Sequence, residues 1–205
     1  MRIAAAALLL VLLSPFAAPA QEAGRLLAVQ QRKFRLQHEL DIGGMFEPVD
    51  AFSKGLGAEG AYIWHLNDEW SWEVLRGGYA VRLDTGLQKQ LERDFGVAPT
   101  AFEALKWWAA SALDWSPVYG KFALRNASLV HAEFLLSLGG AFGKFTSSYL
   151  AGPQLGVGVR VFLSQRLSVR FDARDALFIN PGGSNKVKNL VFLTLSLSIN
   201  LGGAD

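Results

Sequence analysis

The sequence predicts an all-β protein, an eight-stranded antiparallel up-and-down transmembrane β-barrel with a long, partly helical second outer loop. Three observations support this prediction: eight segments alternate apolar with polar residues, the connections between them alternate short with long, and much apolar surface needs cover. The chain has 205 residues and is 51% hydrophobic, with 21 Gly and 14 Phe. Beyond residue 20, no apolar run reaches the roughly 18 residues of a membrane-spanning helix. A barrel resolves this, because lipid covers its outer face and closure pairs its backbone groups.

The first 20 residues have the pattern of a secretory signal peptide. Arg2 precedes an apolar stretch over residues 3–13, and the small residues before Gln21 favour cleavage near Ala20. We expect residues 21–32 to form a periplasmic leader and residues 33–205 to form the barrel. The chain contains no Cys, which excludes a lipoprotein anchor and any disulfide.

The charge of the chain gives no sign of a nucleic-acid partner. The formal net charge is +2, and removal of the signal leaves 19 Lys and Arg against 18 Asp and Glu. A protein that binds nucleic acid normally carries a basic patch or stripe. The sequence therefore predicts no nucleic-acid binding.

Eight segments show the two-residue alternation of strands, in which successive side chains point to opposite faces. In the first segment, for example, Leu40 and Ile42 alternate with Glu39 and Asp41. The predicted strands cover residues 33–46, 54–66, 69–81, 115–125, 129–142, 154–163, 167–177 and 189–201. Each is close to the length of about ten residues that a tilted membrane strand needs.

The predicted connections alternate in length. Turn-forming residues make tight connections near 66–68, 125–128 and 164–166, whereas the connections near 47–53, 82–114, 143–153 and 178–188 are longer. Bacterial barrels have short periplasmic turns and longer outer loops. With a periplasmic N-terminus, every long connection would lie outside the cell.

The connection over residues 82–114 carries two helical patterns. One begins at Asp84 or Thr85 and ends at Gly96, and the other begins with the capping box Thr100–Glu103. The apolar faces of these helices need cover, either on the barrel rim and each other or on an envelope protein partner or lipid. The candidate partner surface consists of Phe102, Trp107 and Trp108.

Charged residues on the second face of the strands are expected to fill the lumen. The predicted lumen network consists of Arg35, Glu39, Asp41, Glu59, Glu73, Lys121, Arg125, His131, Glu133, Arg160, Arg170, Asp172 and Arg174. Apart from His131, six of these are positive and six negative. An eight-stranded barrel is only wide enough for its side chains, and buried charges must be paired. The balance therefore predicts a closed, structural lumen, with a narrow transport pore as the alternative.

Aromatic residues are placed as a membrane-interface belt. This set consists of Tyr62, Trp64, Trp70, Trp72 and Trp115. The first four flank the first tight turn, and Trp115 is expected at the opposite end of its strand. Trp and Tyr prefer the interface because they are apolar with one polar atom. Stacking of a ligand on these rings is the alternative interpretation.

The sequence indicates no catalytic, cofactor-binding or metal-binding residue. His131 and Ser137 lie on one face, as in some lipid-modifying barrel enzymes, but six residues of strand separate them by about 20 Å. That distance is far beyond proton-transfer reach. His131 is better interpreted as a member of the lumen network. We therefore expect a protein that is not an enzyme.

Several segments resemble a known family. They are Asp50–Gly55, His65–Glu73, Pro117–Lys121, Val130–Phe134, Gly156–Arg160 and Arg170–Arg174, in this order along the chain. They are similar to the outer-membrane β-barrel domain family described mainly from myxobacteria, which has the architecture of the small OmpA-type barrels. The resemblance runs from about residue 30 to the C-terminus. It implies an eight-stranded barrel in the outer membrane of a Gram-negative-type bacterium, and it brings no enzymatic activity or ligand.

Overall fold

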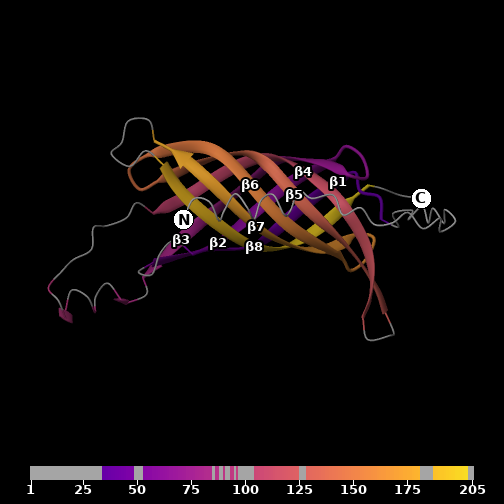
Figure 1. Ribbon diagram of the computed structural model, residues 1–205, viewed down its shortest axis with the longest axis horizontal. Coiled ribbons are helices and arrows are strands. Elements are labelled where there is room, and N and C mark those ends of the chain that lie inside the picture. Colours follow the sequence, from indigo (N-terminus) through magenta and orange to yellow (C-terminus); the bar gives the residue numbers. More distant parts are fainter. Residues whose placement is uncertain are drawn as a thin grey trace, which may run out of the picture. The chain divides into compact units, whose positions relative to one another are not determined.

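The computed structural model is a closed, antiparallel eight-stranded β-barrel, so the predicted fold class is confirmed (Figure 1). It describes residues 34–48, 53–84, 86–87, 90, 93–94, 96, 104–124, 128–180 and 187–202. The strands are β1 (His38–Glu47), β2 (Ser53–His65), β3 (Trp70–Asp84), β4 (Leu105–Leu124), β5 (Ser128–Phe145), β6 (Tyr149–Phe162), β7 (Leu167–Ile179) and β8 (Val187–Leu201). Each strand pairs with the next in sequence, and β8 closes the barrel on β1. The predicted signal peptide, the leader and Arg125 lie outside the described residues.

The strands are strongly staggered. A path of directly paired residues starts at Trp70 and passes Trp115, Leu136, Val157, Ala173, Leu193, Phe46 and Leu56 before it returns to β3 at Val81. Trp70 begins β3 beside a tight turn, whereas Val81 lies near its loop end. A row of paired residues therefore climbs from the turn end towards the loop end as it goes round, which is the stagger of tilted barrel strands.

The prediction of a second helix in the long outer loop is wrong. Residues 105–112 belong to β4, which begins ten residues before the predicted strand at 115 and pairs with β3 and β5. Trp107 and Trp108 therefore point to opposite faces, as successive strand residues do. Apolar residues at helical spacing were a poor guide because both faces of this strand are apolar near the loop end.

The first predicted helix falls mostly outside the described residues. Leu87, Gln90, Arg93 and Asp94 have helical conformation, and the Gln90 amide donates to the Gly86 carbonyl over 3.0 Å. No helix in the described part of the chain is long and apolar enough to cross a membrane.

The connection between β5 and β6 is also shorter than predicted. The strands extend to Phe145 and from Tyr149, so residues 146–148 replace the expected loop over 143–153. The Phe145 amide closes this turn by donating to the Ser148 carbonyl over 2.8 Å. The long connections at this end of the barrel are those before β2, β4 and β8.

Candidate functional site

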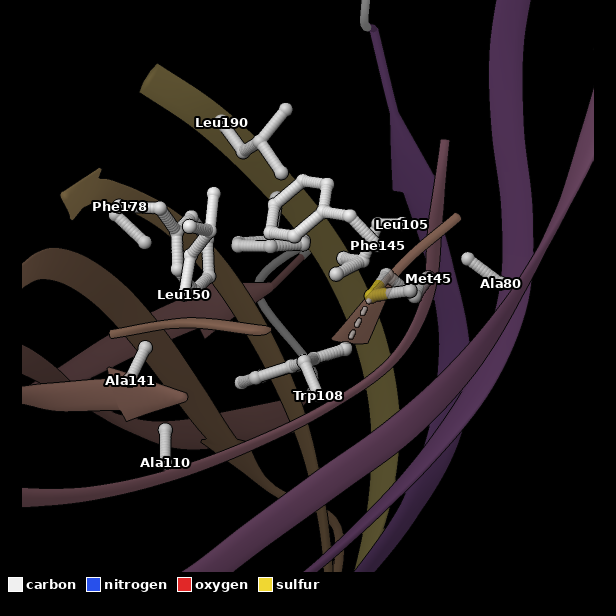
Figure 2. Close-up of a cluster of buried hydrophobic side chains, with 12 residues drawn as sticks. Met45, Ala80, Leu105, Trp108, Ala110, Ala141, Phe145, Leu150, Phe178 and Leu190 are labelled. Carbon is white, nitrogen blue, oxygen red and sulfur yellow. Dashed lines mark hydrogen bonds between the residues drawn. The ribbon is translucent and has the colours of Figure 1, made fainter. Parts of the chain in front are cut away.

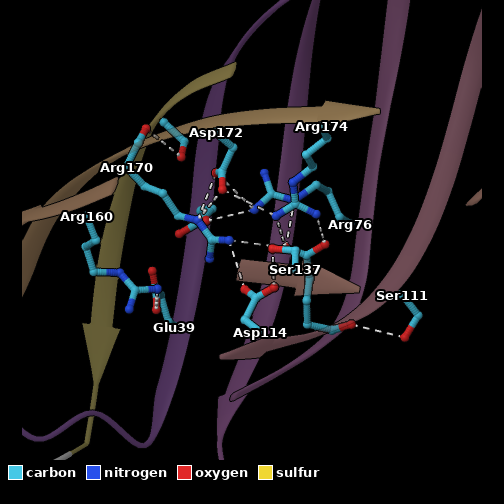
Figure 3. A network of polar contacts seen from close by, with 12 residues as sticks. Glu39, Arg76, Ser111, Asp114, Ser137, Arg160, Arg170, Asp172 and Arg174 are labelled. Carbon is cyan, nitrogen blue, oxygen red and sulfur yellow. Dashed lines mark hydrogen bonds and ion pairs between the residues drawn. The ribbon is translucent and has the colours of Figure 1, made fainter. Parts of the chain in front are cut away.

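The lumen contains a network of buried arginines and acids in its turn-end half and centre (Figure 3). Four arginines are buried: Arg76, Arg160, Arg170 and Arg174. The Arg174 guanidinium donates to both carboxylate oxygens of Glu73, over 2.6 and 2.7 Å. Arg170 bonds Asp172 and Asp114, each at 2.8 Å. Each arginine thus bridges acids from different strands, and the network ties strands across the lumen.

Arg76 is the most connected member of this network. Its Nε donates to Glu73 over 2.9 Å, one Nη donates to Glu59, and the other donates to Asp41 over 3.3 Å. Its side chain is fully buried. Removing such a partner leaves buried carboxylates without compensation, which is strongly destabilising. The network is therefore held together by interdependent pairs.

A second branch of the network lies closer to the turn end. Arg160 donates to Glu39 over 2.6 Å and to Glu133. The same Glu39 carboxylate contacts His65 Nε2 at 2.7 Å. Together the two branches fill the lumen across its width.

Sequence reasoning missed Arg76, Asp114 and Glu47, the last of which lies one residue beyond the predicted first strand. A β-bulge at Val74 inserts one residue between Glu73 and Leu75, because Ile63 pairs with Glu73 while Tyr62 pairs with Leu75. The bulge reverses the alternation, so that Leu75 points outward and Arg76 inward. Asp114 was missed because β4 was predicted to begin one residue later. The spacing of two charges by three residues, at Glu73 and Arg76, is the one signal that could have indicated the bulge.

Arg35 and Lys121 are exposed, contrary to their predicted place in the lumen. Arg35 precedes β1. Lys121 lies where β4 runs past the first residue of β3, since Trp70 pairs with Trp115. The predicted balance of six against six does not hold among the described residues, in which four arginines and eight acids are buried. The buried acids are Glu39, Asp41, Glu47, Glu59, Glu73, Asp114, Glu133 and Asp172.

The loop-end half of the lumen is filled by apolar side chains (Figure 2). The cluster consists of Met45, Ala80, Leu105, Trp108, Ala110, Ala141, Phe145, Leu150, Ala176, Phe178, Leu190 and Phe192. Trp108 stacks on Phe192 at 4.8 Å between ring centroids, and its indole N–H points to Met45 Sδ at 3.2 Å. Gly78 makes room for this indole, because a Cβ there would lie 2.9 Å from Trp108 Nε1. Trp108 therefore belongs to the interior and not to a partner surface.

Aromatic rings close the lumen at the turn end. The Phe34 ring stacks on Phe162 at 5.0 Å and meets the edge of His131 at 5.3 Å, and Tyr119 lies 5.9 Å from His131. His131 thus lies among rings at the end of the lumen. Phe34 precedes β1 and does not continue the outward alternation that the sequence predicted.

The predicted interface aromatics all lie on the exterior. Tyr62, Trp64, Trp70, Trp72 and Trp115 are each 38–44% exposed. Trp115 was expected at the far end of its strand. It lies instead beside Trp70, with stacked rings 5.8 Å apart. A second exterior group at the loop end consists of Trp107, Phe142 and Tyr149, with Lys144 Nζ 5.0 Å from the Tyr149 ring.

The hydroxyl, imidazole and carboxylate groups of the lumen bond mainly within the network. The Ser137 hydroxyl donates to Asp114 over 2.6 Å and is therefore engaged away from His131. Among the described residues, no group of three or more His, Asp or Glu side chains is arranged to hold a metal ion. Phe102 lies outside the described residues. Buried side chains occupy both halves of the lumen.

Comparison with solved structures finds distant likenesses. The N-terminal β-barrel domain of Pseudomonas aeruginosa OprF is 10% identical, with a TM-score of 0.44 over 80% of this chain and 100% of that chain. Neisserial surface protein A is 13% identical, with a TM-score of 0.41 over 80% and 96%. Ail of Yersinia pestis, solved with the heparin analogue sucrose octasulfate, is 10% identical, with a TM-score of 0.40 over 82% and 100%. No protein-family model and no curated protein matches the sequence.

Proposed function

We propose that this chain is an integral outer-membrane β-barrel with a structural or interaction role, whose lumen is closed and whose partners meet it at its exposed surfaces. The observation that carries the proposal is the inverted distribution of polarity. Charged side chains fill the turn-end half and the centre of the interior, whereas Leu, Val, Ile and aromatic residues cover the exterior of the strands. A barrel in water would have the opposite arrangement, and a membrane barrel needs this one.

The two exterior aromatic groups support the membrane placement. Trp107 and Trp115 belong to the same strand and are eight residues apart. At about 3.3 Å per residue and a tilt of roughly 35–45°, they are separated by about 20 Å along the barrel axis. Outer-membrane barrels carry aromatic girdles on both sides of an apolar band about 25 Å tall. The spacing of the girdles therefore suits one bilayer.

The filled lumen favours a structural role over the narrow pore that the sequence left as an alternative. Side chains of Arg76, Arg170 and Arg174 are at most 1% exposed, and so are those of Trp108, Phe145 and Phe178. Ions cross a pore through water, and this interior is packed with paired charges and aromatic rings. A lipid-modifying activity has less support, because Ser137 bonds Asp114.

The finer assignments remain part of this proposal. They are membership of the myxobacterial-type family, export by a signal peptide cut near Ala20, and an envelope protein partner on the outer loops. The connection between β3 and β4 is the longest, and it is therefore the first candidate for the site at which such a partner binds. Trp107 and Trp108 do not belong to this binding site. Trp107 is part of the exterior aromatic group, and Trp108 points into the lumen.

Single-cysteine labelling tests the proposal, because the chain has no Cys and each introduced thiol is unique. Leu195 is 60% exposed on the exterior, and its neighbour Ser196 is 3% exposed in the lumen. In bilayers, Leu195→Cys should react with a lipid-soluble maleimide and resist a water-soluble one. The matched variant Ser196→Cys should resist both reagents.

Rapid reaction of Leu195→Cys with the water-soluble reagent would mean that this face is wet and that the protein is not a membrane barrel. Migration on gels with and without boiling serves as the folding control. A folded barrel migrates differently before heating, so each variant can be scored only on its folded fraction.

A further inference from the structure

One acidic residue lies on the lipid-facing exterior. Among the outward strand residues whose side chains the structure describes, Asp175 is the only acid. It lies in β7, where Ala173 and Leu177 are the neighbouring outward residues and Leu155 and Val191 are its paired neighbours. Ionisable residues in membrane segments are rare and normally pair with another polar group. The position of Asp175 therefore needs an explanation.

The carboxylate of Asp175 has a weak partner. The Asn189 side-chain amide donates to it over 3.3 Å, and the described residues form no ion pair with it. Another polar residue of the exterior, Ser111, is fully engaged. It accepts from the Trp72 indole over 3.1 Å and donates to the Glu73 carbonyl over 3.1 Å. The contrast indicates that Asp175 retains capacity to bind a donor from outside the protein.

An apolar groove leads to Asp175. It has a volume of about 690 Å³ and runs between two rows of outward residues on β4 to β7. One row is Leu113, Leu138, Leu155 and Asp175, and the other is Trp115, Leu136, Val157 and Ala173. The backbone of Ser137 and Gly156 lines the floor between the rows. The groove climbs from the turn-end girdle at Trp115 towards the loop end at Asp175.

The dimensions of the groove select its occupant. Its rows are two residues apart along each strand, which corresponds to about 6.6 Å. The side chains of the two rows occupy part of this spacing, so the space between them admits one alkyl chain and excludes a helix about 10 Å across. An alkyl chain in the groove would place its polar end at Asp175, on the side of the outer girdle. This is the orientation of a lipid in the outer leaflet.

We propose that the groove binds an amine-bearing lipid of the outer leaflet, with its alkyl chain between the two rows and its ammonium group on Asp175. A carboxylate and an ammonium form a charge-assisted hydrogen bond, which is stronger than a neutral one. Asn189 holds the carboxylate towards the interface. The inference rests on the proposed membrane location, since a barrel in water would meet no lipid.

Native mass spectrometry of the full chain tests this inference. The folded protein is released from micelles that contain equal amounts of phosphatidylethanolamine and phosphatidylglycerol with identical chains. We expect roughly fivefold preferential retention of the aminolipid, a difference of about 1 kcal/mol. Asp175→Asn should abolish the preference, because it removes the charge and keeps the shape.

Two further variants make the outcome decisive. Asp68→Asn removes an exposed acid from the turn between β2 and β3, outside the groove, and should leave the preference unchanged. Ala173→Leu narrows the groove, keeps Asp175 and should lower retention of the aminolipid. Equal retention of the two lipids by the unaltered chain, or a preference that survives Asp175→Asn, overturns the inference. Gel mobility before heating is measured on the same samples, and only folded protein is scored. A folded barrel without lipid preference refutes this inference and leaves the membrane proposal to the cysteine labelling.

Discussion

The two halves of the lumen solve the same packing problem with different chemistry. The turn-end half is filled by arginines and acids that bridge strands, whereas the loop-end half is filled by rings and aliphatic side chains. Truncating an apolar side chain costs the contacts of that one residue and the energy of the cavity that it leaves. A buried ionic network also loses the compensation of every charge that remains. The charged half should therefore be the more sensitive and the less additive of the two.

The largest effect is expected in the charged half. Arg76→Leu should lower the free energy of unfolding by about 3–5 kcal/mol, because it removes the arginine bonded to Asp41 and Glu59 and one of the two arginines bonded to Glu73. Urea unfolding of the protein folded in lipid vesicles measures this loss. Adding Glu59→Leu to Arg76→Leu should restore part of the stability. A double variant as unstable as the sum of the two single ones would show that the pairs act independently.

A somewhat smaller effect is expected in the apolar half. Leu150→Ala should cost about 2–4 kcal/mol, because its side chain is 2% exposed within the cluster and its removal leaves a cavity. The same urea titration applies. Its effect should add to that of Arg76→Leu, since no contact joins the two sites in the described network. Strong coupling between them would erase the distinction between the halves.

The exterior gives a third environment against which both halves can be compared. Leu195→Arg should impair folding by roughly 2–4 kcal/mol, because the proposed membrane location puts this exposed side chain in the apolar band. The fraction of protein that folds into vesicles at increasing urea concentration measures this loss of stability. A neutral result would mean that the outward face is hydrated.

The smallest effect is expected at the exterior hydrogen bond between Trp72 and Ser111. Trp72→Phe removes the indole N–H that donates to Ser111 and keeps an aromatic ring at the girdle. The expected loss is about 0.5–1.5 kcal/mol, the net contribution of one hydrogen bond. A loss as large as that of Arg76→Leu would mean that the exterior hydrogen bond stabilises the barrel as strongly as the charged half of the lumen does.

Alternation along the chain was sufficient to predict the barrel and most of its charged interior. Glu39, Asp41, Arg170 and Asp172 all follow the two-residue period. Arg76 could not be predicted from that period, because the bulge at Val74 is a local irregularity that depends on pairing with β2. Trp108 could not be placed because β4 is apolar on both faces at its loop end, so that the period of a strand is lost. Lys121 follows the two-residue period of the strand. It is exposed because β4 extends past the start of β3, and a single sequence does not reveal this stagger between strands.

The division of the lumen also explains why the protein is expected to be closed. Arginines bonded to acids occupy the charged half, apolar side chains occupy the other half, and the rings of Phe34 and Phe162 lie at the turn end. Function is therefore expected at the exterior and the loops.

The most direct measurement is the conductance of the full-length protein in planar bilayers. Insertion is verified by the mobility of the recovered protein before and after heating. The filled lumen predicts no sustained single-channel currents at any applied potential that the bilayer tolerates. Sustained, uniform current steps from the folded protein would contradict it and would show that the two halves of the lumen leave an open path.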